Sequence, residues 1–293
     1  MSLQTRLSAP AMLLKLAAVV ALAAAPAAFA ATGTATAPDG IAIHFTDQGE
    51  GDPALVFVHG WSCDGTYWNE QVKHFAATHR VVVIDLAGHG ASGQERKAYT
   101  MESFGGDVAA VLQQLDLKGA VLVGHSMGGP VVVEAALAAP DRVAGLVGID
   151  NFQNVNLKLP QEAVDTFLAP FEADFKPSVT NWVLRMFPAG ADSALAAGIA
   201  ADMASAPPAV GLSAIRELLR WFSDRATVRL AELKVPLMCV SADLQPTQAE
   251  PMKALVPRYE LRVLPKCGHF LMRENPAGFN ALLAETVAAI VKP

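Results

Sequence analysis

The chain is poor in cysteine and in charge of either sign. Its 293 residues include 3 cysteines, charged residues make up 17% of the sequence, and the net charge is −6. No run of lysine or arginine occurs, so the sequence lacks the electrostatic footprint of a protein that binds nucleic acid or an acidic membrane surface. We therefore expect a small neutral molecule as its partner.

The cysteine count excludes a complete disulfide framework, because three cysteines cannot all pair. Cys239 lies inside an apolar run that predicts a strand. A bridge between Cys63 and Cys267 is open in an oxidising compartment, but the sequence does not establish it. The histidines show no spacing typical of metal ligands, and we expect neither a metal nor another cofactor.

The first 30 residues have the pattern of a leader. Basic residues precede the apolar run Leu16 to Ala25, and Ala28-Phe29-Ala30 supplies the small-x-small pattern of a signal-peptidase site. An uncleaved anchor is the alternative, but Pro26 and the many alanines fit a cleavable segment better than a membrane span. We expect cleavage before Ala31, export to the periplasm or the outside, and no stable membrane insertion afterwards.

Beyond the leader, apolar runs alternate with helical patterns. The strand-like runs are Ala54 to His59, Arg80 to Asp85, Ala120 to Gly124, Val143 to Asp150, Pro236 to Ser241 and Tyr259 to Leu264. Helical candidates are Tyr67 to Ala76, Met101 to Leu115, Val131 to Ala139 and Ala277 to Val291. Near-continuous apolar strands separated by helices predict a mostly parallel sheet covered on both faces. The alternating stretch Ile41 to Asp47 predicts an antiparallel edge strand.

The regular alternation stops between residues 152 and 233. This stretch contains several prolines and the helical pieces Ala163 to Leu168, Val179 to Phe187 and Ser213 to Trp221. Its apolar content is too high for a solvated linker, so we expect a helical cap inserted between two strands. The core then consists of residues 31–151 and 234–293, with the cap at residues 152–233.

A serine is framed by glycines between a predicted strand and a predicted helix, in Gly124-His125-Ser126-Met127-Gly128. Glycine at both flanks removes the collision that a side chain would make with the neighbouring backbone at a sharp turn. Such a turn exposes the hydroxyl and places the N–H of Met127 at a helix start, where it can help bind an oxyanion. Ser126 is therefore the candidate nucleophile.

A serine hydroxyl needs an imidazole that takes its proton and a carboxylate that fixes the imidazole tautomer. His269 follows the last predicted strand, which places it at the same sheet edge as the serine and makes it the candidate base. His59 and His89 lie in His-Gly turns and are expected to make structural hydrogen bonds. His125 is expected to point away from the nucleophile's face. The N–H of Trp61, after the first core strand, is the expected second oxyanion donor.

The stretch Gly88 to Gly93 formally matches a dinucleotide-binding fingerprint after a predicted strand. That fingerprint must open a helix whose N-terminus faces the pyrophosphate. The following residues Gln94 to Tyr99 are polar and show no apolar period, so a nucleotide-binding oxidoreductase is disfavoured.

Four pieces of the sequence together resemble the α/β-hydrolase family: His59-Gly60-Trp61, Asp85 to Ser92, Gly124 to Gly129 and Gly268-His269-Phe270, in family order across residues 41–293. The resemblance implies the α/β-hydrolase fold, with an eight-stranded, mostly parallel sheet flanked by helices. It also implies Ser126 as nucleophile and His269 as base. Haloalkane dehalogenases and epoxide hydrolases fit less well, because those relatives use an aspartate where this chain has Ser126.

The orienting acid departs from the family pattern. The family commonly places it after the seventh strand, where this chain has Gln245, which cannot carry the negative charge. Asp243 and Asp150 are the two substitutes, and some branches of the family draw the acid from the sixth strand end, where Asp150 is expected. We favour Asp150 and keep Asp243 as the alternative.

These residues predict a secreted carboxylic-ester hydrolase that forms an acyl-enzyme on Ser126, with thioesters, lactones and amides as related substrates. A cofactor-free perhydrolase or haloperoxidase and a non-catalytic binding module are the alternatives, although the intact serine and histidine favour turnover. The cap is expected to set substrate choice. The residues expected to form the apolar wall of the substrate site are Trp61, Phe152, Trp182, Phe187, Trp221 and Phe222. Several of them fit the cap's own core equally well.

Overall fold

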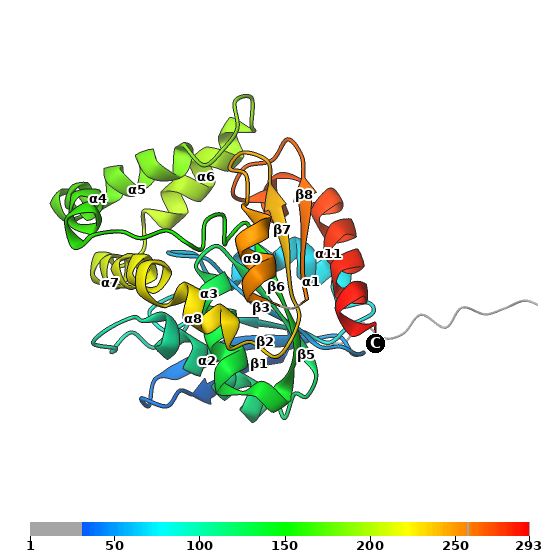
Figure 1. The fold of residues 1–293 in the computed structure, drawn as a ribbon. Coiled ribbons are helices and arrows are strands. Elements are labelled where there is room, and N and C mark those ends of the chain that lie inside the picture. The colour runs from blue at the N-terminus through cyan, green and yellow to red at the C-terminus, as the bar shows by residue number, and fades with distance from the viewer. Residues whose placement is uncertain (1–30, 257, 293) are drawn as a thin grey trace, which may run out of the picture.

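The computed structural model describes residues 31–256 and 258–292 and contains an eight-stranded sheet in the order β1-β2-β4-β3-β5-β6-β7-β8 (Figure 1). The strands are β1 (Ala31–Thr36), β2 (Ala42–Gln48), β3 (Leu55–Val58), β4 (Val81–Ile84), β5 (Ala120–His125), β6 (Val143–Ile149), β7 (Leu237–Ala242) and β8 (Tyr259–Leu264). β2 runs antiparallel to both β1 and β4, and the remaining neighbours are parallel. The expected signal peptide, residues 1–30, lies outside the described residues.

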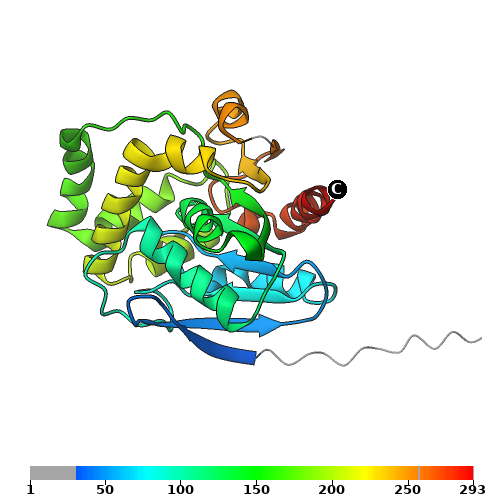
Figure 2. The same cartoon turned by 60° about the horizontal axis from the view of Figure 1, so that its bottom comes forward.

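The central strands are apolar because helices cover both faces of the sheet. Every residue of β3, β4, β5 and β7 is buried. One face carries α2 (Met101–Gln114), α3 (Gly128–Ala138) and α8 (Ala226–Ala231), while α1 (Asn69–Phe75) and α11 (Pro276–Val291) pack together on the other (Figures 1 and 2). The predicted α/β-hydrolase architecture is confirmed.

The stretch Ile41 to Asp47 was predicted as an antiparallel edge strand, and the antiparallel direction is confirmed but the edge position is wrong. β2, predicted as the edge, is paired on both sides, and β1 forms the edge beyond it. β1 has the sequence Ala-Thr-Gly-Thr-Ala-Thr, of which only Ala35 is buried. It therefore carries no apolar period that a sequence pattern could detect, and its place in the sheet depends on backbone pairing with β2.

The segment from residue 152 to residue 233, between β6 and β7, is called the helical insertion below. It contains α4 (Gln161–Ala173), α5 (Phe175–Leu184), α6 (Ser193–Met203), α7 (Pro208–Arg220), a π-helical turn (Trp221–Arg225) and α8. The alanine-rich α6 has no counterpart among the helices expected from the sequence. α9 (Ala249–Leu255) links β7 to β8, and α10 (Leu271–Glu274) precedes α11.

Two tryptophans attach the helical insertion to the core. The Trp221 indole donates to Glu134 of α3 at 2.7 Å, and Arg229 Nε donates to the same carboxylate at 2.9 Å. From the core side, the Trp61 indole donates to the carbonyl of Gly211 in α7 at 2.8 Å. Buried polar groups are costly to leave unpaired, so these contacts hold the insertion in one position against the core.

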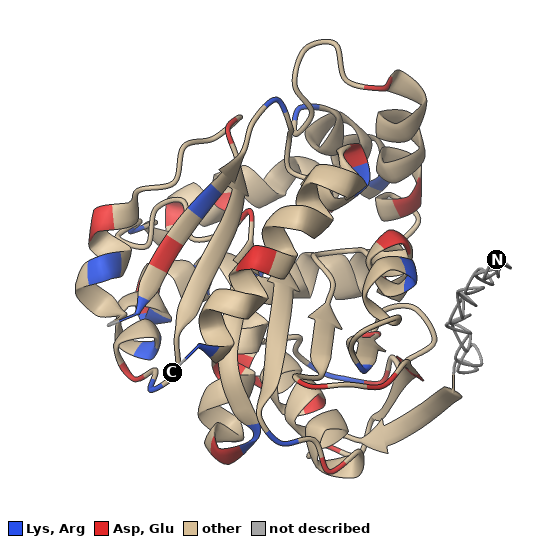
Figure 3. Cartoon of the chain, turned by 90° about the vertical axis from the view of Figure 1, so that its right-hand side faces the viewer, with Lys and Arg blue, Asp and Glu red and all other residues tan. Residues whose placement is uncertain are grey.

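Acidic and basic residues are interspersed over the elements shown in Figure 3. Within the described ranges, no single helix is long and apolar enough to cross a membrane. The bent pair Ser193–Met203 and Pro208–Ala231 meets that test only when its helices are counted together, and by length and composition alone.

Candidate active site

Ser126 sits at the turn between β5 and α3 with a left-handed φ of 51°, and its N–H donates to the Ile149 carbonyl at 2.9 Å. A Cβ on Gly124 would lie 2.2 Å from the Gly128 carbonyl oxygen, and a Cβ on Gly128 would lie 2.6 Å from that of Val58. Both flanking positions therefore require glycine. A non-glycine residue at such a φ costs of order 1–3 kcal/mol, and strain of this kind gathers at functional sites.

The loop after β8 brings His269 to the end of β6, where Asp150 lies. His269 Nδ1 and Asp150 Oδ2 are 2.6 Å apart, and the Asp150 side chain is 5% exposed. The other oxygen of Asp150 accepts the N–H of Ala242 at 2.9 Å. With Nδ1–H donating to this carboxylate, Nε2 carries the lone pair that a general base needs.

The other candidate acid, Asp243, makes a different contact. Its carboxylate is exposed and accepts the N–H of Lys266 at 2.9 Å. Gln245, at the usual family position of the acid, lies in the wall of a cavity that Ser126 and His269 share. Of the carboxylates weighed from the sequence, Asp150 is thus the one that the structure brings to the His269 ring.

Ser126, Asp150 and His269 open onto one cavity of about 640 Å³. Among the described residues, no hydrogen bond joins the side chains of Ser126 and His269. Such bonds are often long or poorly aligned without substrate and tighten when it binds, so the shared cavity is the more informative observation.

The two expected oxyanion donors flank the serine. Within residues 31–256 and 258–292, neither the N–H of Trp61 nor that of Met127 donates to a protein acceptor. Gly60 permits the close approach of the two turns, because a Cβ there would lie 3.3 Å from Ser126 Cβ and 2.9 Å from His125 Nδ1. Two unused N–H groups next to a serine are the donor arrangement that acyl transfer requires.

The expected wall residues divide into two sets. Trp182 and Phe222 line the large cavity, and Trp61 lines a small inner cavity beside Ser126. Phe152 is fully buried against Trp221 and Phe222, with ring centroids 6.4 and 6.1 Å away. The structure does not bring Phe152, Trp221 or Phe187 to the cavity wall.

Each of these three side chains has another partner that accounts for its position. Phe152 belongs to the apolar core beneath the insertion, the Trp221 indole is engaged with Glu134, and the Phe187 ring stacks on Phe270 at 5.3 Å. They contribute to packing within and under the insertion, the alternative that the sequence left open.

The cavity wall also contains aliphatic residues of α7 that the sequence did not single out. They are Ile215, Leu218 and Leu219, which share a helix face with the expected Phe222 of the following turn at spacings of three and four residues. The same period fits any helix packed on a core, so it predicts burial but not a cavity. The remaining new wall residues are Asn151, Gln153, Phe167, Arg185, Met186 and Leu244.

The expectation that His125 points away from the site was incomplete. His125 Nε2 lies 2.9 Å from the His269 carbonyl oxygen, to which it can donate, and the two rings are 4.7 Å apart. Burial lowers the pKa of His125 well below its usual value, so this ring is neutral. A neutral donor here supports the His269 loop without placing a like charge beside the imidazolium.

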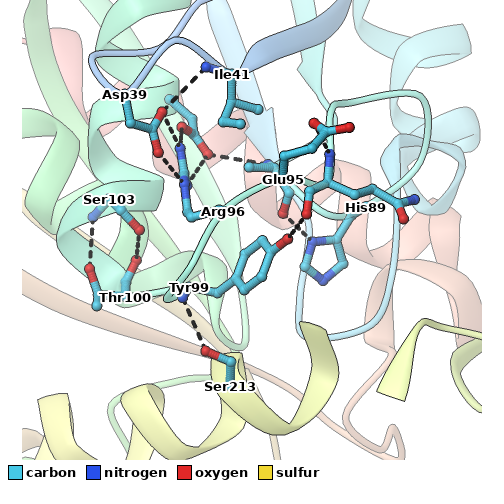
Figure 4. Close-up of polar contacts among 12 residues, drawn as sticks. Asp39, Ile41, His89, Glu95, Arg96, Tyr99, Thr100, Ser103 and Ser213 are labelled. Atoms are coloured by element: carbon cyan, nitrogen blue, oxygen red, sulfur yellow. Dashed lines mark hydrogen bonds and ion pairs between the residues drawn. The ribbon is translucent and has the colours of Figure 1, made fainter. Parts of the chain in front are cut away.

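The stretch that resembles a dinucleotide fingerprint belongs to a non-helical loop. α2 begins only at Met101, and Arg96 fixes the loop by pairing with Asp39 at 2.7 Å and with Asp107 at 2.6 Å (Figure 4). Tyr99 N–H donates to Ser213 Oγ of α7 at 3.1 Å, which joins the loop to the insertion (Figure 4). With no helix opening at the glycines, the loop lacks the N-terminus that would face a pyrophosphate.

The histidines of the His-Gly turns make the structural hydrogen bonds expected of them. His59 accepts the N–H of Leu86 at 3.0 Å, and His89 Nδ1 contacts the carbonyl of Ala87 at 3.0 Å. Burial lowers the pKa of His89 to about 3 and also lowers that of His59. Both rings are therefore neutral structural elements.

All three cysteines lie in the described part of the chain, and all are free and buried. The bridge between Cys63 and Cys267 that the sequence left open is absent. Burial raises the pKa of Cys63, and it raises that of Cys267 to about 11. Such thiols are poor nucleophiles, which leaves Ser126 as the candidate nucleophile of this site.

The family model described as alpha/beta hydrolase fold matches residues 53–276. The chain belongs to the α/β-hydrolase fold family. It is 38% identical over 152 residues to a non-heme chloroperoxidase of Streptomyces lividans, covering 48% of this chain and 55% of that protein. It is 37% identical over 143 residues to the bifunctional esterase/perhydrolase DCH of Acinetobacter calcoaceticus, covering 45% and 52%. The chain thus matches about half the length of these curated relatives.

Two solved α/β-hydrolase structures extend over nearly the whole described chain. Est816, an N-acyl homoserine lactone degrading enzyme, superposes with a TM-score of 0.74 and 27% identity, covering 86% of this chain and 99% of Est816. A thermophilic esterase from Thermogutta terrifontis superposes with a TM-score of 0.74 and 25% identity, covering 90% and 100%. The insertion and the sheet edge are therefore parts of one recurring fold.

Proposed function

We propose that this α/β-hydrolase hydrolyses carboxylic esters through an acyl-enzyme on Ser126. The observation that carries the proposal is the contact of 2.6 Å between His269 and the buried Asp150, in a cavity that also contains the strained Ser126. A buried carboxylate on one ring nitrogen and a serine in the same cavity are the parts that nucleophilic acyl transfer needs.

The reaction proceeds in two halves. Ser126 Oγ attacks the ester carbonyl carbon while His269 Nε2 takes the hydroxyl proton, and Asp150 stabilises the imidazolium that forms. The N–H groups of Trp61 and Met127 donate to the oxyanion. Collapse expels the alcohol, which receives the proton from His269. Water then adds to the acyl-enzyme by the same route and releases the acid and free Ser126.

The cavity wall favours substrates with an apolar acyl or alcohol part. Trp182, Phe222 and the aliphatic face of α7 belong to it, and Arg185 is the one lysine or arginine among its described lining residues. The volume of about 640 Å³ is in the range of pockets that hold small organic ligands. Lactones and thioesters present the same carbonyl chemistry and belong to the same proposal.

A perhydrolase is the second candidate, and the similarity to a chloroperoxidase and to an esterase/perhydrolase favours it. In that reaction hydrogen peroxide replaces water as the acceptor of the acyl group and the product is a peracid. The same serine, histidine and aspartate serve both reactions, so the two candidates differ only in which small nucleophile attacks the acyl-enzyme.

Labelling with a fluorophosphonate tests the common step. We expect one equivalent of probe, located on Ser126 by peptide mass spectrometry, and no labelling of Ser126→Ala. The partition of p-nitrophenyl butyrate turnover between butyrate and perbutyrate, at graded peroxide concentrations, then separates the two candidates. An unlabelled Ser126 in folded protein would contradict both.

We also propose that the chain is exported, on the leader pattern of residues 1–30 alone. The test is the N-terminus of the protein recovered from a bacterial periplasm, which should be Ala31. Recovery of the full-length chain in the cytoplasm would contradict export.

A further inference from the structure

Glu274 is a second carboxylate beside His269 that the mechanism above does not use. It ends α10, and its side chain turns back toward the loop that precedes this helix. Its two oxygens accept the N–H of Gly268 at 3.1 and 2.9 Å, and one of them accepts the N–H of Phe270 at 3.1 Å. The two amides that flank His269 in the chain are therefore held by one carboxylate.

The backbone of His269 itself is held from two other directions. Its N–H donates to the Met186 carbonyl of the helical insertion at 2.9 Å, and its carbonyl faces His125 Nε2 at 2.9 Å. A Cβ on Gly268 would lie 2.3 Å from the same Met186 oxygen, so the close contact needs glycine. Together with Asp150 on the ring, these bonds leave the His269 loop little freedom.

The charge of Glu274 also acts on this loop. Burial raises the pKa of Glu274, whereas the bonds from Gly268 and Phe270 and a protonated His269 lower it. Charged and titratable groups face it from several elements. They are His269 and Asp150 at the catalytic side, and Asp192, Asp243, Lys266 and Cys267 around a second cavity that Glu274 borders.

We propose that Glu274 is a positioning residue for His269: it holds the loop through two N–H groups and places a second negative charge near the imidazolium formed during attack. The inference rests on the proposed acyl transfer by Ser126. Glu274 touches neither substrate nor the reacting atoms, so its effect passes through His269.

Two substitutions separate the two parts of this role. Glu274→Gln keeps the size and one carbonyl oxygen but removes the charge. Glu274→Asp keeps the charge, but its shorter side chain cannot reach both amides. The matched control is Asn275→Ala, which removes a helix cap on the adjacent residue, where the Asn275 side chain accepts the N–H of Gly278 at 3.0 Å.

The rate at which a fluorophosphonate labels Ser126, measured from pH 5 to 9, is the first readout. A negative charge near His269 favours the protonated ring, so Glu274→Gln should move the acid limb of the profile to lower pH, by about half a unit, and slow labelling at pH 7 about tenfold. Glu274→Asp should slow labelling without moving the limb. Asn275→Ala should lower Tm with neither effect.

Turnover of p-nitrophenyl butyrate gives the second readout. We expect Glu274→Gln to lower kcat and to leave KM within about twofold of wild type, because the cavity wall is unchanged. A loss confined to KM would contradict a role that acts through His269.

NMR of the His269 ring gives a readout that needs no catalysis. If the midpoint pH of its signals falls in Glu274→Gln while Ser126 is not labelled in wild type, the proposed function fails and the positioning role stands. If neither the midpoint nor the limb moves and only Tm falls, as in Asn275→Ala, Glu274 is a helix cap and the proposal is overturned. Should Glu274→Gln not fold, a wild-type labelling rate in Glu274→Asp would overturn it.

Discussion

The sheet edge and the helical insertion meet at one cavity but contribute to it in different ways. The edge supplies polar groups held in strained backbone, with φ of 51° at Ser126 and 46° at Asp150. The insertion supplies aromatic and aliphatic side chains on helix faces, such as Trp182 and Phe222. Chemistry and substrate choice are therefore expected to depend on separate parts of the chain.

The largest effect is expected at the sheet edge. Ser126→Ala removes the proposed nucleophile from a turn whose glycines remain, so kcat should fall on the order of a thousandfold or more while Tm stays close to wild type. Hydrolysis of p-nitrophenyl butyrate with active-site titration is the measurement. Retained turnover would remove Ser126 from the mechanism.

A smaller loss is expected from the acid, and it separates two aspartates of the same edge. Asp150→Asn leaves His269 without a tautomer-fixing carboxylate and should lower kcat at least on the order of a hundredfold. Asp243→Asn replaces an exposed acceptor for the N–H of Lys266 and should change kcat by less than about threefold. Equal losses in both variants would contradict the assignment of Asp150.

Two phenylalanines of the insertion distinguish cavity wall from core. Phe222→Ala enlarges the cavity and should shift the preference along a series of p-nitrophenyl esters toward longer acyl chains, by about tenfold for the best pair. Phe152→Ala should leave that preference unchanged but lower the free energy of unfolding by about 3–5 kcal/mol, because Phe152 is fully buried. A changed preference in Phe152→Ala would mean that the division between wall and core is wrong.

Between pH 7.5 and 5.0, the titration of buried histidines should act on the core, because the insertion contains no histidine. In the folded state burial lowers the pKa of His89 to about 3 and lowers the pKa values of His59 and His125. Below about pH 6.5 the unfolded chain binds protons that the folded chain does not, so stability falls as pH falls. Each histidine contributes at most about 1.4 kcal/mol per pH unit.

Urea unfolding at pH 7.5, 6.0 and 5.0 measures the slope of the free energy of unfolding against pH. His89→Asn retains a donor for the Ala87 carbonyl. It should reduce the slope of the free energy of unfolding against pH by at most the contribution of one proton, and this reduction should persist down to about pH 3. The exposed His74→Asn is the control and should leave the slope unchanged. An identical slope in both variants would contradict the burial argument for His89.

The sequence predicted the sheet and the placement of Ser126, Asp150 and His269 well because each of these depends on local pattern. A strand end and its flanking glycines fix where a side chain emerges, and parallel strands bring such ends to one edge. The cavity wall depends instead on how α5 and α7 pack on the core. Trp182 and Trp221 look equivalent in the sequence, yet only Trp182 lines the cavity.

Two further features could not have been predicted for different reasons. β1 has almost no apolar side chains, and its position comes from backbone pairing that sequence periodicity does not report. Glu274 accepts hydrogen bonds from the backbone N–H groups of residues 268 and 270. Nearly every residue carries such a group, so the residue types at these positions do not predict the hydrogen bonds.

Because Asp150 contacts His269, the loop after β7 does not have to supply the orienting carboxylate. That loop lines the cavity through Leu244 and Gln245, yet its acid, Asp243, binds the backbone of Lys266 rather than the histidine. Because no carboxylate must be kept there, residues 244 and 245 can be exchanged without disturbing the three groups proposed for proton transfer. Substitutions at these two positions are therefore expected to alter which molecules enter the cavity while the proposed reaction stays the same.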